Sequence, residues 1–140
     1  MKKSTTELLE LLSKSADFDI YMQQNQSEIV SNSLPHLLEN LLTKKNINKS
    51  DCIEQSGLDR TYAYQILSGL KSPSRDKLVA LCLGAKCNLE EVQTLLKHSA
   101  YPPLYPRTQR DCALIYSFTH SLSVLELNEI LYELDEPIIK

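Results

Sequence analysis

Glycine is scarce in this chain, with only three among 140 residues. Tight hairpin turns depend on glycine for backbone conformations that other residues avoid, and no strand-turn-strand pattern is visible. Leucine recurs instead at the spacing of one helix face, where every third or fourth residue is apolar. The clearest stripe consists of Leu34, Leu37, Leu38, Leu41 and Leu42. These features predict an all-α fold.

Long apolar segments are missing as well. No run of about 18 apolar residues occurs, so we expect no membrane span. The first residues, Met-Lys-Lys-Ser, begin like a signal peptide. However, Glu7 and Glu10 interrupt the apolar stretch that follows, and no cleavage site comes after it. We expect a cytoplasmic protein.

Metal-binding patterns are absent from the cysteines and histidines. No C-x-x-C pair occurs, and the cysteines lie among apolar residues, which is typical of reduced, buried cysteines in a cytosolic protein. The histidines are too far apart in sequence to complete a zinc site. We expect no metal and no other cofactor. The residues concerned are Cys52, Cys82, Cys87, Cys112, His36, His98 and His120.

Catalytic motifs are missing too. The chain has no glycine-rich phosphate loop, no G-x-S-x-G and no H-E-x-x-H. Single histidines and cysteines scattered over helices do not form a catalytic set. We therefore predict that the protein is not an enzyme.

The charge is unevenly distributed along the chain. The net charge of −3 excludes a globally basic nucleic-acid binder. Residues 34–98 nevertheless carry nine Lys or Arg against seven Asp or Glu, a net of +2. Residues 1–33 have a net of −2 and residues 99–140 a net of −3. This pattern favours a DNA-reading domain between acidic flanks.

We divide the chain into three parts. Residues 1–33 form an N-terminal helical extension, with one helix from 5 to about 14 and a second from 17 to about 28. Residues 34–98 form a helical domain. Residues 99–140 comprise a Tyr/Pro joint at 101–106 and a helical hairpin, at 108–120 and from 123 to about 134, that we expect to pack on the same core. The joint reads either as a packed connector or as a proline-rich ligand.

Residues 34–98 contain start signals for five helices. A Ser, Asn or Asp stands where each helix begins, and its side chain can accept from free backbone N–H groups. The second and third helices are short and meet at Gly57, which we expect to close the second helix in a left-handed turn. Two short helices at a fixed angle can place the second in a DNA major groove. The expected caps are Ser33, Asn48, Asp59, Ser74 and Asn88.

This segment resembles the lambda-repressor-like, or Cro/Xre-type, helix-turn-helix family over about residues 34–98. Lys49 stands where the family usually has Gln, and Asp59 stands where it usually has Ser before the recognition helix. The residues that carry the resemblance are Ile47-Asn48-Lys49, Cys52-Ile53, Ser56-Gly57-Leu58-Asp59, Ile66 with Gly69, Pro73-Ser74, Leu78, and Asn88-Leu89-Glu90-Glu91. The resemblance implies a five-helix domain whose recognition helix spans about residues 60–68.

The resemblance also implies which residues meet double-stranded DNA. Arg60 would fork onto guanine and Gln65 would pair with adenine, while Thr61 and Tyr64 would touch a phosphate or a thymine methyl. Basic and hydroxyl side chains around them would hold phosphates. The full expected set is Lys49, Arg60, Thr61, Tyr64, Gln65, Ser68, Lys71, Ser74 and Arg75.

Two functional interpretations follow. The first is a sequence-specific transcriptional regulator that acts as a homodimer, because one such module buries too little surface to be specific. The second is a protein-interaction module, such as an antitoxin or regulatory adaptor, that has the fold without strong DNA binding. Asp59, the acidic flanks and a protein-binding face on the C-terminal helices would suit the second. The basic residues, Arg60 among them, would then be ordinary surface charges.

Overall fold

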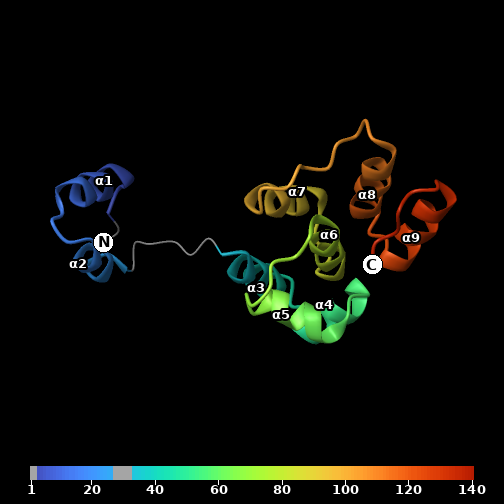
Figure 1. The fold of residues 1–140 in the computed structure, drawn as a ribbon, viewed down its shortest axis with the longest axis horizontal. Coiled ribbons are helices and arrows are strands. Elements are labelled where there is room, and N and C mark those ends of the chain that lie inside the picture. The colour runs from blue at the N-terminus through green and yellow to red at the C-terminus, as the bar shows by residue number, and fades with distance from the viewer. Residues whose placement is uncertain (1–2, 27–32) are drawn as a thin grey trace. The chain divides into compact units, whose positions relative to one another are not determined.

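The computed structural model describes residues 3–26 and 33–140. It divides into two compact units, Met1–Asn32 and Ser33–Lys140 (Figure 1). Within the described residues there are nine helices and no strand, which confirms the predicted all-α class. None of these helices has both the length and the apolar character needed to cross a bilayer.

The N-terminal unit is a pair of short helices, α1 (Thr5–Lys14) and α2 (Phe18–Gln24). The first helix begins at Ser4, whose Oγ accepts from the Glu7 backbone N–H at 3.1 Å. Tyr21 is buried against α1 and its hydroxyl donates to the Leu8 carbonyl at 3.3 Å. The second helix ends earlier than expected, and Glu28 lies outside the described residues.

The second unit arranges seven helices around one core. Because α6 is apolar on all sides, it takes the central position and packs against α4, α7 and α9 (Figure 1). Core residues come from both the 34–98 and the 99–140 segments, from Leu38 through Ile139. The helices are α3 (Leu34–Lys44), α4 (Lys49–Ser56), α5 (Arg60–Leu67), α6 (Arg75–Gly84), α7 (Leu89–His98), α8 (Gln109–Thr119) and α9 (Val124–Glu133).

The helix boundaries follow the capping residues read from the sequence. The caps at α3 to α7 are confirmed, and Asn88 with Glu91 forms both arms of a capping box. Ser123 and Glu126 form a second box at α9. Thr108 precedes α8 without a side-chain cap hydrogen bond. Gly57 has φ of 72°, the left-handed conformation expected where α4 ends.

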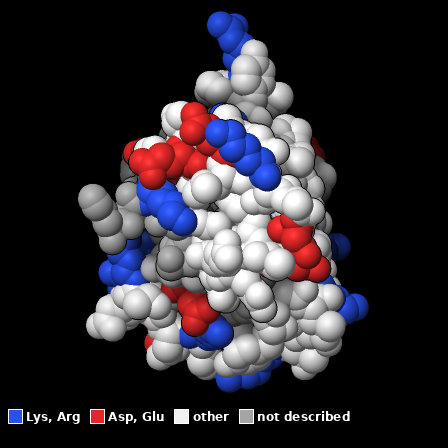
Figure 2. All heavy atoms as spheres, turned by 90° about the vertical axis from the view of Figure 1, so that its left-hand side faces the viewer, with Lys and Arg blue, Asp and Glu red and all other residues white. Residues whose placement is uncertain are grey.

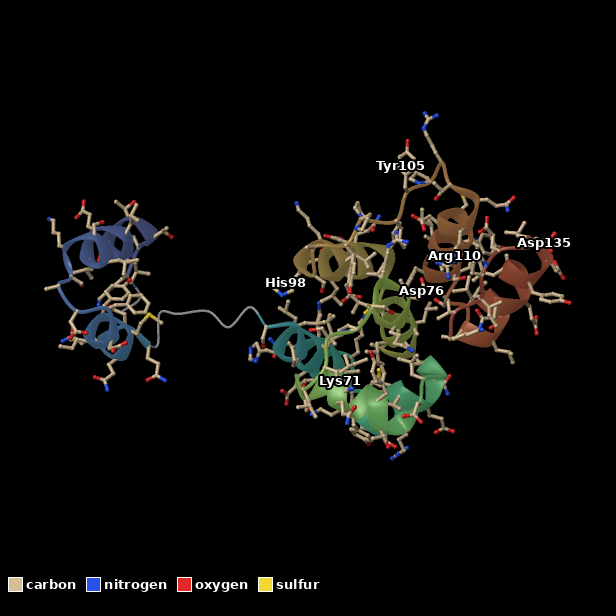
Figure 3. The ribbon with its side chains drawn as sticks, in the orientation of Figure 1. Lys71, Asp76, His98, Tyr105, Arg110 and Asp135 are labelled. Atoms are coloured by element: carbon tan, nitrogen blue, oxygen red, sulfur yellow. The ribbon has the colours of Figure 1, made fainter. Side chains whose placement is uncertain are left out.

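Two reciprocal ion pairs join the first turns of α6 and α8. Arg75 binds both carboxylate oxygens of Asp111, at 3.1 and 2.9 Å. Arg110 binds both oxygens of Asp76 at 2.8 Å, and Figure 3 shows these two side chains close together. Each helix therefore supplies one arginine and one aspartate. We call this four-residue cluster the α6–α8 clamp.

Within the clamp, pairing lowers the pKa of Asp111 and raises the pKa of Arg110. Desolvation acts to raise the pKa of Asp111, but hydrogen bonds from Arg75 and from the Tyr105 backbone outweigh it and hold the pKa below its ordinary value. The hydrogen bond to Asp76 raises the pKa of Arg110 against the opposing effect of desolvation. The charged forms of both groups are therefore stabilised by folding.

The Tyr/Pro joint is tied to the core at several points. The amide of Gln93 exchanges two hydrogen bonds with the Leu104 backbone, at 2.7 and 2.9 Å, and the Leu104 side chain is buried. The Tyr101 hydroxyl donates to the Pro73 carbonyl. Tyr105, in contrast, points outward with half of its surface exposed. The joint is thus a connector packed through Tyr101 and Leu104.

The last residues have no helix but are held by several hydrogen bonds. The amide of Asn128 on α9 binds both the N–H and the C=O of Ile139, at 2.8 and 2.9 Å, and Ile139 is buried. Arg110 also donates from Nε to the Pro137 carbonyl at 3.0 Å. Residues 135–140 therefore complete the core, a role that the sequence pattern did not indicate.

We predict that Asp111→Asn lowers the free energy of unfolding at pH 7 by about 3 kcal/mol, because Arg75 loses its carboxylate in a partly buried position. The pKa of Asp111 is lowered in the folded state, so its stabilisation exists above the ordinary carboxyl pKa of about 3.9 and is lost as the pH falls through the folded-state value. Urea denaturation should show that the difference in free energy of unfolding between the wild type and the variant becomes smaller below about pH 4.

The matched control for this variant is Asp135→Asn. Asp135 is exposed and has φ of 57°, a conformation that Asn tolerates well. Its effect should stay within about 0.5 kcal/mol. An Asp111→Asn protein as stable as the wild type at pH 7 would contradict the role we give to the clamp.

We also predict that Gly84→Ala destabilises the second unit by about 1–3 kcal/mol, because α4 leaves no room for a methyl group. A Cβ at Gly84 would lie 2.3 Å from the Cys52 carbonyl oxygen and 3.1 Å from the Ser56 nitrogen. Thermal unfolding measures the effect, with Thr94→Ala on the exposed face of α7 as the control. An unchanged melting temperature for Gly84→Ala would show that α4 and α6 are not in close contact.

Candidate nucleic-acid interface

The turn between α4 and α5 is fixed by a buried serine. Ser56 Oγ donates to the Ile53 carbonyl at 2.6 Å and accepts from the Leu58 N–H at 3.2 Å. Leu58 is itself buried, and Gly57 supplies the left-handed residue between them. These interactions bind the end of α4 to the start of α5. The angle between the two helices is therefore set by the core.

Helix α5 has a buried face and an exposed face. Ala63, Ile66 and Leu67 are buried in the core. The other face contains the expected DNA-contacting residues of this helix. Of these, Arg60, Thr61, Tyr64 and Ser68 are exposed and Gln65 is half-buried. One helix therefore displays five of the nine expected residues together.

The guanidinium of Arg60 contacts Ser50 and Tyr64. Its Nη2 donates to Ser50 Oγ at 3.1 Å and to the Tyr64 hydroxyl at 3.4 Å. Its guanidinium carbon lies 5.3 Å from the centre of the Tyr64 ring. These contacts orient the exposed guanidinium and leave further N–H donors on it for a ligand. Sequence reasoning missed Ser50, which lies on α4 in the first turn.

Two lysines lie near the ring of Tyr62, in the first turn of α5. Lys71 Nζ lies 5.9 Å and Lys77 Nζ 5.0 Å from the ring centre. Figure 3 shows Lys71 beside α5. The aromatic ring attracts both ammonium groups. Lys77 Nζ also donates to the Lys140 carbonyl at 3.3 Å.

The surroundings of Lys49, Ser74 and Ser68, three other polar residues of the expected set, differ from one another. Lys49 is exposed at the first position of α4, where the helix dipole also favours an anion. Ser74 Oγ caps α6 by accepting from the Lys77 N–H at 3.3 Å. Ser68 Oγ donates to the Gln65 carbonyl at 3.1 Å. Both hydroxyls thus have intramolecular roles and remain at the surface.

Arg75 requires a correction. We expected it among the DNA contacts, but it belongs to the α6–α8 clamp, and its side chain is only 22% exposed. Besides the two bonds to Asp111, it donates to the carbonyls of Pro102 and Pro103 at 3.0 and 3.2 Å. Four hydrogen bonds to its own chain leave the guanidinium without the freedom to bind a phosphate. We remove Arg75 from the set.

Lys45 is also engaged elsewhere. Its Nζ lies 2.9 Å from a carboxylate oxygen of Glu91, the residue that closes the capping box of α7. Desolvation acts to raise the pKa of Glu91, but the Asn88 backbone and Lys45 outweigh it and lower the pKa. The pair joins α3 to α7 and lies apart from the residues of α5.

Asp59 caps the start of α5, as expected from the sequence. Its Oδ2 accepts from the Tyr62 N–H at 3.0 Å, which satisfies a backbone donor at the start of α5. The carboxylate stands directly before Arg60 in the chain. An anionic ligand at Arg60 would therefore meet a negative charge next to its binding residue.

Metal chemistry finds no support in the described residues, which contain no cluster of three or more His, Cys, Asp and Glu arranged to hold an ion. Three cysteines are buried and Cys112 is exposed. Burial, with Cys87 nearby, raises the pKa of the Cys52 thiol to about 12, which disfavours the thiolate that a metal needs.

Comparisons with known proteins give no assignment. No protein-family model, no curated protein and no solved structure matches the chain. The functional argument therefore depends on the geometry described above.

Proposed function

We propose that the protein is a sequence-specific, double-stranded-DNA-binding transcriptional regulator with a lambda-repressor-like arrangement of α3 to α7. Helix α5 is the recognition helix and enters the major groove. The observation that carries the proposal is Arg60, which is exposed on α5 and oriented by Ser50 and Tyr64. A guanidinium held in this way loses little freedom when it forks onto the O6 and N7 of guanine.

Lysines lie near both helices of the pair. Lys71 and Lys77 are close to the Tyr62 ring, and Lys49 stands at the first turn of α4. Lysines next to a recognition helix bind phosphates as point charges and fix its register in the groove. The proposed contacts are Lys49, Arg60, Thr61, Tyr64, Gln65, Ser68, Lys71 and Ser74.

The net charge of −3 does not oppose this proposal, because residues 34–98 have a net charge of +2 and the excess of acidic residues lies in the two flanking segments. Helix α9 and the residues after it carry Glu126, Glu129, Glu133, Asp135 and Glu136. The charge that DNA meets at short range is that of the docked face, since salt screens more distant charges over about 8 Å at physiological ionic strength. The protein acts as a homodimer on two half-sites about one helical turn apart.

We predict that Arg60→Glu weakens binding to a random pool of duplex DNA about 10-fold or more, because it removes a base contact and adds repulsion. Fluorescence anisotropy at low salt measures the affinity. The control is Arg107→Glu, the same charge change at an exposed residue in the loop before α8, which lies at the opposite end of the second unit from α5 (Figure 1). Equal losses in the two variants would show that only overall charge matters.

A protein-binding function is the second candidate, and a specific surface favours it. On α9, Leu125 is 71% exposed and Tyr132 is 79% exposed, with Glu129 and Glu133 beside them. Exposed apolar residues with acidic neighbours suit a basic, amphipathic protein segment. The two functions can coexist, because α9 and α5 are different surfaces.

Salt dependence separates the two candidates. We predict that the wild-type affinity for duplex DNA falls steeply between about 50 mM and about 200 mM salt, since each neutralised phosphate releases counterions. Leu125→Asp should leave this binding unchanged, because α9 takes no part in it. No binding at the lower salt concentration would rule out the DNA function and leave the protein-binding function.

A further inference from the structure

We propose that α1 pairs with α1 of a second copy of the chain, antiparallel, and that this pairing forms the homodimer. The inference extends the proposed function, since a dimer is what two DNA half-sites require, but the evidence for it lies in the N-terminal unit alone. The partner surface is the apolar stripe of α1, by which we mean the row of leucine side chains along one side of this helix.

The described residues of the N-terminal unit leave several large apolar side chains exposed. Among its described residues only Tyr21 and Asn25 are buried, and α1 contributes no buried residue at all. A unit this small cannot stabilise itself with a core of its own. The exposed fractions are 65% for Leu9, 43% for Leu11, 41% for Leu12, 64% for Phe18 and 50% for Ile20.

The exposed residues of α1 include Leu9, Leu11 and Leu12. In Figure 2 the acidic and basic groups are scattered, with uncharged surface between them. A ten-residue helix is also too short to be stable in water without packing. Both points indicate that α1 is covered by another surface.

The charges on α1 select a second copy as the partner. If the half-buried Leu8 and the exposed Leu11 occupy the a and d positions of a heptad, Glu7 and Lys14 both fall at g, on one flank of the stripe and seven residues apart. A two-fold axis across the helices reverses the direction of the second α1. That flank then faces its own copy, with Glu7 opposite Lys14 at both ends.

A parallel pairing would not give this match. Both helices would run in the same direction, and Glu7 would lie level with Glu7 of the other copy. The antiparallel arrangement thus forms two identical ion pairs from one sequence, which is the self-complementarity of an isologous interface. Glu10 lies on the opposite side of the helix from Leu8 and takes no part in the contact.

The first test measures self-association of the full chain without DNA, by sedimentation velocity over a concentration series. We expect a dimer. Leu12→Glu should raise the dimer dissociation constant about 100-fold or more, because each dimer loses two apolar contacts. Circular dichroism controls for folding, since Glu is itself a good helix former.

The second test is a charge-swap cycle at low salt. Glu7→Lys and Lys14→Glu should each weaken the dimer about 10-fold by creating like-charge pairs at both ends, and the double variant should restore the wild-type affinity. Both changes oppose the helix dipole, so their combination can rescue the dimer only through pairing between chains. Glu10→Lys, with the same charge change away from the stripe, is the matched control.

Each outcome decides the proposal. A monomeric wild type, whether α1 packs on its own chain or on another protein, overturns it, as does a dimer that Leu12→Glu leaves intact. A dimer lost with Leu12→Glu but not rescued by the double variant overturns the antiparallel geometry. Because no DNA is present, these results are independent of the success or failure of the DNA-binding proposal.

Discussion

The α6–α8 clamp is the interaction on which the second unit depends. Arg75 binds Asp111 and two proline carbonyls, and Arg110 binds Asp76 and the Pro137 carbonyl. Through these bonds the central helix α6, the Tyr/Pro joint, α8 and the last residues are joined at one place. Charged groups in such partly buried positions stabilise a fold only when their hydrogen bonds are satisfied, and the clamp meets this requirement through paired carboxylates and carbonyls.

The clamp also shows which charged residues stabilise the fold and which remain available to a ligand. Arg75 and Arg110 are directed into the molecule, and Lys45 is paired with Glu91. The groups left toward solvent near the helix pair include Arg60 and Lys71, both organised by tyrosine rings. These one-to-one pairs leave the net charge of −3 unchanged, so the charge of any one face depends on where the remaining charged residues lie. In our proposal the exposed face of α5 meets DNA while α1 supplies the dimer.

Features that depend on residues close together in the sequence were predictable, whereas contacts between residues far apart in the sequence were not. The caps at Asn88 and Ser123 could be read from the sequence, since a capping residue and its backbone partners lie within three positions. The partner of Arg75 lies 36 residues away and could not be read from the sequence, so the resemblance alone suggested a DNA contact for it. For the same reason, the hydrogen bonds from Asn128 to Ile139 were not foreseen. The exposed face of α5 followed from helical periodicity, whereas the support that Ser50 gives to Arg60 depends on the angle between two helices.

The most direct test of the central claim, that α5 reads duplex DNA, is selection of bound sequences from a random duplex pool with the full chain. The account predicts enrichment of a site with two half-sites whose centres are about 10 base pairs apart, or a multiple of that spacing. Guanine should be prominent where Arg60 docks, and this preference should disappear when the selection is repeated with the Arg60→Glu chain. A pool that emerges without any enriched sequence would contradict the claim.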